Sequence, residues 1–242
     1  MKKKGFKNYF NILYLVMISL SILLLADPAV DVMKRARSAA DSPKQKEQLT
    51  IVLDAGHGGR DPGKVGINGA LEKDINLSIA LKLRDLLELN DINVIMTREE
   101  DTGLYSESDS NKKVVDMRKR VDLINNSNAA LAVSVHQNSF TQESIKGSQV
   151  FYFSNSKEGK EFAETMQDQL KKSLQDGNKR VAKANDSYYM LKKSQCPLVI
   201  VECGYLSNNG EAALLIDENY QEKMAWAIHL GLLAYLNDTV DK

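Results

Sequence analysis

Hydrophobic and polar residues alternate with two different periods along most of this chain, and each period predicts one kind of element. Short apolar runs bounded by polar residues predict β-strands. These runs occupy residues 50–55, 93–97, 131–135, 148–153, 188–191 (the weakest) and 198–201. Apolar residues spaced three or four positions apart predict helices with one buried face. The segments with this spacing are residues 72–90, 114–128, 157–176 and 219–237.

The order of these elements predicts the fold class. Strands that alternate with helices are typical of α/β domains, and a β-α-β-α-β order favours parallel pairing because each helix carries the chain back along the sheet. We therefore expect a single α/β domain with roughly six strands in a mostly parallel, twisted sheet flanked by helices. The sequence contains no internal repeat and no sign of a second domain.

The N-terminal segment has the pattern of a chain that enters a membrane. A cluster of lysines precedes an apolar run at residues 10–26, which is typical of signal peptides and export-oriented anchors. Cleavage after residue 26 would place bulky Leu24 where a small residue is required, so we expect an uncleaved anchor at 1–26 with the rest outside the cytoplasm. The charged residues 27–48 predict a linker, and 49–240 the folded domain. The lysine cluster and the linker disfavour a buried core helix.

Charge and cysteine content narrow the function classes. The chain has 242 residues, with 32 Lys plus Arg against 32 Asp plus Glu. Nucleic-acid-binding proteins usually carry a basic excess, so this balance argues against that class and leaves sugar-rich or charged polymers open. Cys196 and Cys203 flank a predicted strand. Because a strand rises about 3.3 Å per residue, their separation of roughly 23 Å excludes a disulfide.

Three side chains capable of metal binding or acid–base chemistry stand where predicted strands end: His57, His136 and Glu202. In an α/β sheet the carboxyl ends of parallel strands meet at one edge, so we expect these side chains to lie close together. Two imidazoles and a carboxylate are a first indication of a hydrolytic zinc site.

The glycine-rich segment around His57 and the helix after it each have a second interpretation. The segment AGHGGRDPGKVGING superficially resembles a phosphate-binding loop, but it lacks the Lys-Ser/Thr pair and the Gly-x-Gly-x-x-Gly spacing of phosphate motifs. Glu72, at the start of the predicted helix, can simply complement the helix dipole. Spacing alone favours this structural role for Glu72.

His136, Glu202 and His229 also have structural interpretations. A histidine at a strand end, such as His136, is as often structural as functional. Glu202 can form a salt bridge with a buried arginine, since its strand is apolar. The arginines available for this are Arg98, Arg118 and Arg120. His229 lies on the last predicted helix without a second ligand at helical spacing, so we expect it to be structural or exposed.

Five motifs follow one another along the chain. They are LDAGHGGRDPGKVGINGALEKDINLSIALKLRDLL (53–87), TREED (97–101), MRKRVDLIN (117–125), SVHQNS (134–139) and VECGYLSNNGEAALL (201–215). Together they resemble the motifs of the zinc-dependent N-acetylmuramoyl-L-alanine amidases, the family often called amidase type 3. The resemblance covers the chain from Leu49 onward.

The resemblance implies roles for individual residues. In that family the histidine of GHGG, the glutamate of E-K-D and the histidine of S-x-H bind zinc. These positions correspond to His57, Glu72 and His136. The glutamate that opens the last motif is catalytic and corresponds to Glu202. Gln137 stands where small residues are frequent, at the expected rim of the pocket.

The reaction implied is hydrolysis of the amide between N-acetylmuramic acid and L-alanine, which removes stem peptides from peptidoglycan. Zinc lowers the pKa of a bound water from about 15.7 to about 7. Glu202 is then expected to accept the proton of that water and pass it to the leaving amine.

The layout of anchor, linker and one domain resembles the germination-specific, spore-cortex amidases of endospore-forming bacteria, where stripped muramic acid becomes muramic-δ-lactam. This implies a location in the forespore or spore envelope. With no wall-binding domain in the sequence, we expect an accessory protein to position or activate the enzyme. Two alternatives remain at this point: a zinc peptidase that cuts within the stem peptide, and a non-catalytic wall-binding regulator.

Overall fold

The computed structural model describes Met17 and residues 48–240. The anchor expected at 1–26 and the linker expected at 27–48 therefore lie outside the described residues, apart from Met17 and Gln48. Within the described part of the chain, no helix is both long enough and apolar enough to cross a membrane.

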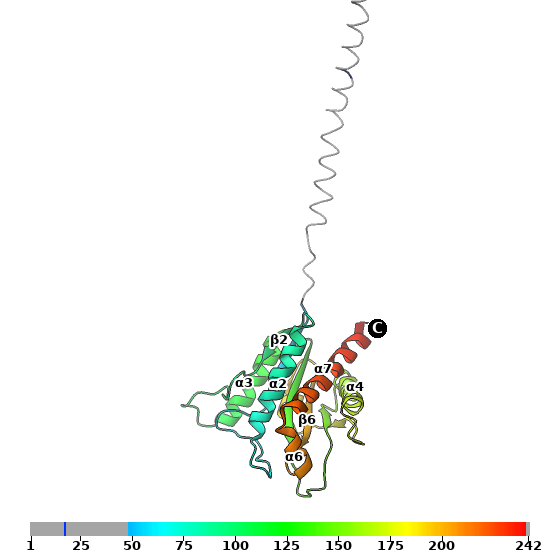
Figure 1. Ribbon diagram of the computed structural model, residues 1–242. Helices are drawn as coiled ribbons and strands as arrows, with labels where there is room; N and C mark the ends of the chain where they lie inside the picture. Colours follow the sequence, from blue (N-terminus) through cyan, green and yellow to red (C-terminus); the bar gives the residue numbers. More distant parts are fainter. Residues whose placement is uncertain (1–16, 18–47, 241–242) are drawn as a thin grey trace, which may run out of the picture. The chain divides into compact units, whose positions relative to one another are not determined.

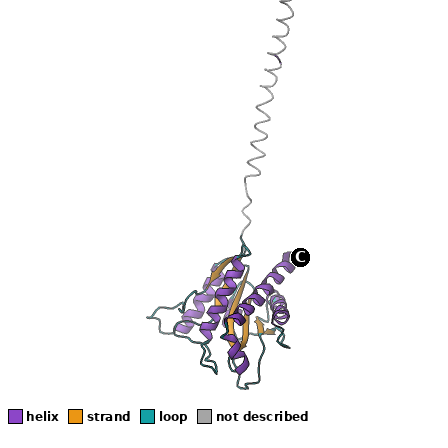
Figure 2. Ribbon diagram, viewed as in Figure 1, coloured by secondary structure: helices purple, strands orange, loops and turns teal. Residues whose placement is uncertain are grey.

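One six-stranded sheet forms the centre of the domain (Figure 2). Its strands are β1 (Thr50–Ala55), β2 (Asn93–Met96), β3 (Leu131–Asn138), β4 (Gln149–Tyr152), β5 (Lys183–Ala184) and β6 (Leu198–Tyr205). They lie in the order β2-β1-β3-β6-β4-β5. Every neighbouring pair is parallel except β4 with β6. The predicted α/β domain with a mostly parallel sheet is confirmed.

Helices cover both faces of this sheet (Figure 1). They are α2 (Glu72–Glu88), α3 (Lys112–Asn126), α4 (Lys157–Leu174), α5 (Tyr189–Lys193), α6 (Asn209–Leu215) and α7 (Glu218–Val240). The apolar faces of α2, α4 and α7 pack in one core with side chains of the sheet, and those of α3 and α5 pack in a second. The sheet is therefore buried on both faces, as its near-continuous apolar strands require.

Helix α4 shows how local sequence sets an element. Its buried positions include Phe162, Met166 and Leu170, which follow the helical period predicted for this segment. The side chain of Ser156 accepts a hydrogen bond from the backbone N–H of Gly159 and caps the first turn. The cap fixes where the helix begins, and the apolar stripe fixes which side faces the core.

The strand predicted at 188–191 is wrong. Residues Tyr189–Lys193 form helix α5, which buries Met190 and Leu191, and the sixth strand is the two-residue β5. The side chain of Asn185 accepts hydrogen bonds from the backbone N–H groups of Ser187 and Tyr188, so a turn precedes the helix. Four apolar or aromatic residues are too few for their period to separate a strand from a helix.

Strands β3 and β6 each continue beyond their predicted ends into polar residues. They run to Asn138 and Tyr205, and in their parallel register His136 pairs with Glu202. The register shifts between His136 and Asn138, which marks an irregularity at this point of the ladder. Two candidate residues are thus placed side by side on neighbouring central strands.

Both cysteines are free, as predicted. Cys196 is partly buried just before β6, whereas Cys203 is buried within it. Burial raises the pKa of the Cys203 thiol, so it is held as a neutral side chain in the core.

Candidate metal centre

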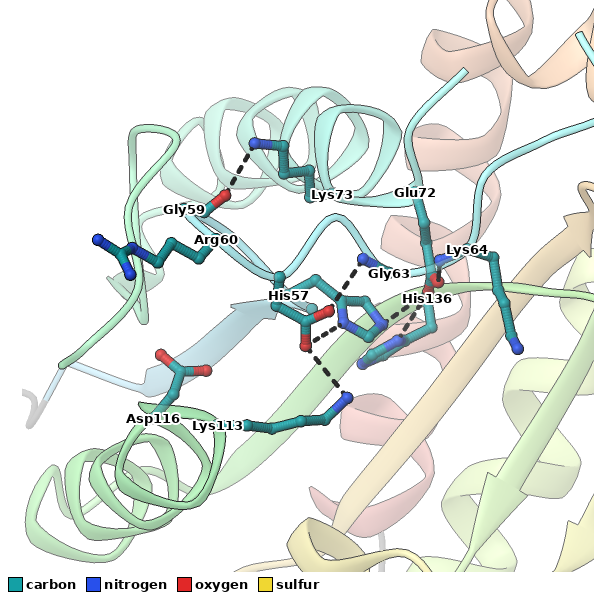
Figure 3. A network of polar contacts seen from close by, with 12 residues as sticks. His57, Gly59, Arg60, Gly63, Lys64, Glu72, Lys73, Lys113, Asp116 and His136 are labelled. Atoms are coloured by element: carbon teal, nitrogen blue, oxygen red, sulfur yellow. Dashed lines mark hydrogen bonds and ion pairs between the residues drawn. The ribbon is translucent and has the colours of Figure 1, made fainter. Parts of the chain in front are cut away.

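Three of the predicted site residues converge at the carboxyl edge of the sheet (Figure 3). His57 follows β1, Glu72 opens α2 and His136 lies in β3. Glu72 Oε1 is 3.2 Å from His57 Nε2 and 3.0 Å from His136 Nδ1. One potential ligand atom of each residue lies within 4.8 Å of the other two. The structure therefore brings together two histidines and a glutamate, although His57 and His136 are 79 residues apart in the sequence.

Glycines allow this close approach. A Cβ atom on Gly56 would lie 2.3 Å from the ring of His136, so no larger residue fits there. Gly63 has a φ of +67°, and a Cβ on it would lie 2.5 Å from Glu72 Oε2. The glycine-rich segment thus makes room for the side chains of the candidate metal centre, and this explains its glycine content without a bound phosphate.

Both carboxylate oxygens of Glu72 are held by backbone donors. The N–H of Gln137 donates to Oε1 (3.1 Å) and the N–H of Lys64 donates to Oε2 (2.8 Å). Burial alone would raise the pKa of Glu72, but the hydrogen bonds and charges of His136 and His57 hold it well below its usual range. Glu72 is 2% exposed. A residue that only complemented the helix dipole would face solvent, so this geometry favours a ligand.

Asp61 orients the ring of His57. Its Oδ2 lies 3.0 Å from His57 Nδ1 and 3.3 Å from Lys113 Nζ. Burial would raise the pKa of Asp61, but the hydrogen bond and charge of His57 lower it. A carboxylate on one ring nitrogen fixes the tautomer and leaves the other nitrogen as the electron-pair donor. The ring of His57 therefore presents Nε2 to the centre.

A buried arginine holds the backbone that carries His57. Arg120, on α3, is 1% exposed and donates to Asp116 (2.6 Å) and to Asp54 (2.6 Å). Its Nη2 also donates to the backbone carbonyl of His57 (2.6 Å). His57 has a φ of +61°, a left-handed conformation that costs energy for a residue with a side chain. The guanidinium stabilises the backbone in that conformation.

Glu202 lies in β6 as the register partner of His136 and is 7% exposed. Its Oε2 has no hydrogen-bond partner among the described residues. Burial raises the pKa of Glu202 to about 7, with the charge of His136 opposing the rise and that of Glu72 adding to it. A cavity of about 530 Å³ is lined by Glu202 together with His57, Glu72 and His136.

The alternative interpretation of Glu202, a salt bridge with a buried arginine, is not supported, because no such ion pair is present among the described residues. Arg120 pairs with the two aspartates on its own side of the sheet. Arg98 donates to the backbone carbonyls of Ala55 and Gly56, and Arg118 is exposed on α3. A buried carboxylate without a cationic partner is a candidate acid–base group.

Some residues of the site were not found from the sequence. Asp61, Lys113 and Tyr188 line the cavity. Only Asp61 carried a local signal, since it follows His57 by four residues. Gln137 was expected at the rim, but it is 3% exposed and its amide donates to Asn76 Oδ1 (3.2 Å), so it belongs to the inner wall.

His229 lies on α7 and does not line the cavity. Its Nε2 is 3.1 Å from the side-chain nitrogen of Asn90, and burial lowers its pKa. It packs against the ring of Trp226, with 5.3 Å between ring centroids. These contacts fit a structural histidine.

The donor set fits a divalent metal ion. Two imidazole nitrogens and one carboxylate oxygen are ligands that zinc and other first-row dications take, and a catalytic site of this kind leaves a further position open. The oriented ring of His57 and the fixed carboxylate of Glu72 are the supports that such sites require. The unpaired oxygen of Glu202 provides a proton acceptor at the same cavity.

Comparisons with known proteins point in the same direction. A family model described as N-acetylmuramoyl-L-alanine amidase matches residues 51–234. The germination-specific N-acetylmuramoyl-L-alanine amidase of Bacillus subtilis is 40% identical over 194 residues, covering 79% of this chain and 81% of that protein. The CwlD amidase of Clostridioides difficile, solved in complex with the GerS lipoprotein, is 45% identical with a TM-score of 0.76, covering 78% of this chain and 99% of that one. The N-acetylmuramoyl-L-alanine amidase of Clostridium difficile 630 is 31% identical with a TM-score of 0.70, covering 79% and 98%.

Proposed function

The chain belongs to the N-acetylmuramoyl-L-alanine amidase family, and from this premise we propose that it is a zinc hydrolase of peptidoglycan. Its reaction is hydrolysis of the amide that joins the lactyl group of N-acetylmuramic acid to L-alanine. The observation that carries this proposal is the convergence of His57, Glu72 and His136 beside the unpaired carboxylate of Glu202.

In this proposal His57, Glu72 and His136 would hold the metal, and the atoms that face one another there are His57 Nε2, Glu72 Oε1 and His136 Nδ1. Two histidines and one glutamate are a ligand set of hydrolytic zinc sites, which supports zinc over a metal that prefers only oxygen ligands. When bound, zinc supplies Lewis acidity to the substrate carbonyl and to the attacking water.

Glu202 moves the proton in this mechanism. Its Oε2 accepts the proton of the attacking water and delivers it to the nitrogen of L-alanine as the amide bond breaks. A general base works best with a pKa near the operating pH, and burial raises the pKa of Glu202 to about 7. During this step Asp61 keeps His57 in place, and the backbone N–H of Gln137 keeps Glu72 in place.

The biological setting is proposed from the relatives. The Bacillus subtilis relative is named as germination-specific, and the Clostridioides difficile amidase was solved with a lipoprotein bound. We propose that this chain acts outside the cytoplasm on spore-cortex peptidoglycan, where its product is the precursor of muramic-δ-lactam. An accessory lipoprotein would support it there. Residues 1–26 would serve as anchor, 27–48 as linker and 49–240 as the catalytic domain.

Digestion of cortex peptidoglycan by the purified protein tests the reaction. We expect mass spectrometry to find intact stem peptides with a free L-alanine amino terminus and glycan with unsubstituted muramic acid. Shortened stem peptides would instead show a zinc peptidase. No release by the zinc-loaded protein, with or without an accessory lipoprotein, would indicate a non-catalytic wall-binding regulator.

Glu202→Gln provides the matched control for this digestion. The variant keeps the shape of the side chain but removes the proton acceptor, so we expect turnover to fall by about 10²- to 10⁴-fold. Zinc content should not change, because Glu202 is outside the ligand group. A variant that releases stem peptides at the wild-type rate would contradict the role of Glu202.

A further inference from the structure

We propose that a second cavity, beside the metal centre on the same edge of the sheet, binds an acidic stem peptide of the substrate polymer. The stem peptide it holds is a neighbour of the one being cleaved. This inference rests on the proposed function, since it names a further binding site for the same polymer. The cavity measures about 520 Å³, close to the 530 Å³ of the cavity at the metal centre.

The second cavity lies beside the start of β4, the strand that pairs with β6 at Glu202. Its wall includes Gly147, just before β4, and the first residue of β4, Gln149, is the register partner of Glu202. Glu211, also in the wall, accepts hydrogen bonds from the backbone N–H groups of Gly147 (2.7 Å) and Tyr205 (2.7 Å). These contacts tie the cavity to the end of β6, the strand that carries Glu202.

A short segment separates the two cavities. Ser139 lines the cavity at the metal centre, and Lys146 lines the second. The segment between them is attached to the turn after β6, because the N–H of Phe140 donates to Ser207 and the side chain of Asn208 donates to the carbonyl of Glu143. The two cavities therefore lie on either side of this segment, at the edge of the sheet where β6 ends.

The charges of the second cavity favour an anionic ligand. Its basic side chains are Lys146, Lys179 and Arg180. They outnumber its two acidic side chains: Glu211 accepts the two backbone hydrogen bonds given above, and Asp176 accepts one from the N–H of Asn178 (3.0 Å). Neither lysine forms an ion pair within the described residues, so both ammonium groups are available to a carboxylate.

The walls are also fixed before any ligand arrives. Arg180 donates to the carbonyl of Lys146 (2.8 Å) and to Gln149 (3.1 Å), and its guanidinium lies 4.7 Å from the ring centre of Tyr205. Asn178 donates to the carbonyl of Ser148 (2.7 Å). A site held in this way loses little conformational freedom when it binds.

The ligand class follows from the polymer. Peptidoglycan repeats a disaccharide whose stem peptides carry free carboxylates, so one strand presents several anionic peptides in series. One peptide at the metal centre leaves the next available to the second cavity. Glycines in the wall (Gly147, Gly177 and Gly210) leave space for the peptide backbone, and the exposed side chain of Leu214 offers an apolar contact.

The test compares two substrates with three double variants. The double variant Lys146→Glu/Lys179→Glu reverses the charge of the cavity. Its matched control is Lys119→Glu/Lys172→Glu, two exposed lysines that line neither cavity and give the same change of net charge. Each protein is assayed in full length on long peptidoglycan strands and on a single disaccharide with one stem peptide.

We expect the cavity variant to raise KM for long strands by about fivefold or more over the control variant, since two favourable ion contacts become repulsive. Activity on the single disaccharide–peptide should equal that of the control, because this substrate reaches only the metal centre. Lys146→Arg/Lys179→Arg, which keeps the charge, should retain the wild-type KM.

Equal KM values for the cavity and control variants on long strands would overturn the inference. An equal loss on both substrates would also overturn it, because the change would then act through the metal centre. If only stimulation by an accessory lipoprotein were lost, the cavity would be a protein-docking surface and not a peptide site. Failure of the proposed function is distinct from all of these, since it would leave the amide between muramic acid and L-alanine of the single disaccharide–peptide intact with the wild-type protein.

Discussion

Replacing Arg120 with methionine tests whether the buried ion network supports the metal centre. Methionine keeps much of the side-chain volume but removes the positive charge and every donor. Asp54, which is fully buried, would lose its ion pair at 2.6 Å, and the carbonyl of His57 would lose a donor at 2.6 Å. The change therefore affects both the core and the backbone that carries a proposed ligand.

The structure sets the size of the effect. Removing one partner of a buried ion pair costs about 3–5 kcal/mol, because a buried charge is left uncompensated. Burial would raise the pKa of Asp54, but the charge of Arg120, helped by His136, Ser134 and Thr97, lowers it from 3.8 to about 2. That lowering of the pKa corresponds to about 2 kcal/mol of net stabilisation of the ionised form. A loss of about 3 kcal/mol is thus the expected result at neutral pH.

Urea unfolding at pH 7 measures this loss, with Arg118→Met as the control on the same helix. Because Arg118 is exposed, its replacement should change the unfolding free energy by less than about 0.5 kcal/mol. Zinc affinity of the Arg120→Met protein, measured by competition with a chelator, should also weaken, because the left-handed backbone of His57 is no longer held. A stable Arg120→Met protein with wild-type zinc affinity would refute this reasoning.

Three further predictions concern the metal centre. Asp61→Asn should weaken zinc binding about 10- to 100-fold, since the partner of His57 Nδ1 loses its charge; unchanged affinity in chelator competition would contradict the orienting role. Gly56→Ala places a Cβ 2.3 Å from the ring of His136 and should weaken zinc binding by about tenfold or more, and a protein with normal zinc content would show that the ring can move freely. The pKa of Glu202 is raised from 4.5 to about 7, so the folded protein binds more protons than the unfolded chain between these values, and metal-free stability should fall as pH rises through that window. Denaturant titrations at several pH values should find this loss, of about 3 kcal/mol, missing in Glu202→Gln.

The periods of the hydrophobic residues correctly predicted the α/β architecture. The elements that were predicted wrongly or missed have local causes. Long apolar runs such as 50–55 and 131–135 matched β1 and β3 because a strand buried on both faces leaves few alternatives. The run at 188–191 was too short to decide between periods, and it forms a helix after the turn that the side chain of Asn185 closes. The helix α6 was also missed, because its seven residues are too few to show a clear helical period. Its start is set by Asn208, whose side chain accepts a hydrogen bond from the N–H of Glu211.

The metal centre was only partly accessible to reasoning from spacing. Strand ends located His57, His136 and Glu202, because the sheet brings them to one edge. Glu72 was different, since spacing favoured a helix-dipole role and only the family resemblance implied a ligand. Its position depends on the glycine segment folding back, with the N–H of Glu72 donating to the carbonyl of Lys64 (2.9 Å).

The supports of the centre could not be predicted from local pattern. Arg120 lies 63 residues from His57 and holds it through a backbone carbonyl. Neither the residue type nor its spacing predicts such a contact, because the sequence does not show which acceptor a buried arginine will find. The orphaned oxygen of Glu202 was equally invisible, since it depends on where each arginine of the neighbouring elements finds its acceptors.

Hydrolysis in water enriched with heavy oxygen tests the central claim most directly. The zinc-loaded protein is incubated with cortex peptidoglycan in this water, and the products are resolved by mass spectrometry. If His57, Glu72 and His136 hold zinc and Glu202 activates water, one heavy oxygen atom should enter the lactyl carboxylate of muramic acid, and the released stem peptides should carry none from the cleavage. Label in a carboxylate of the stem peptide, with muramic acid unlabelled, would contradict the account.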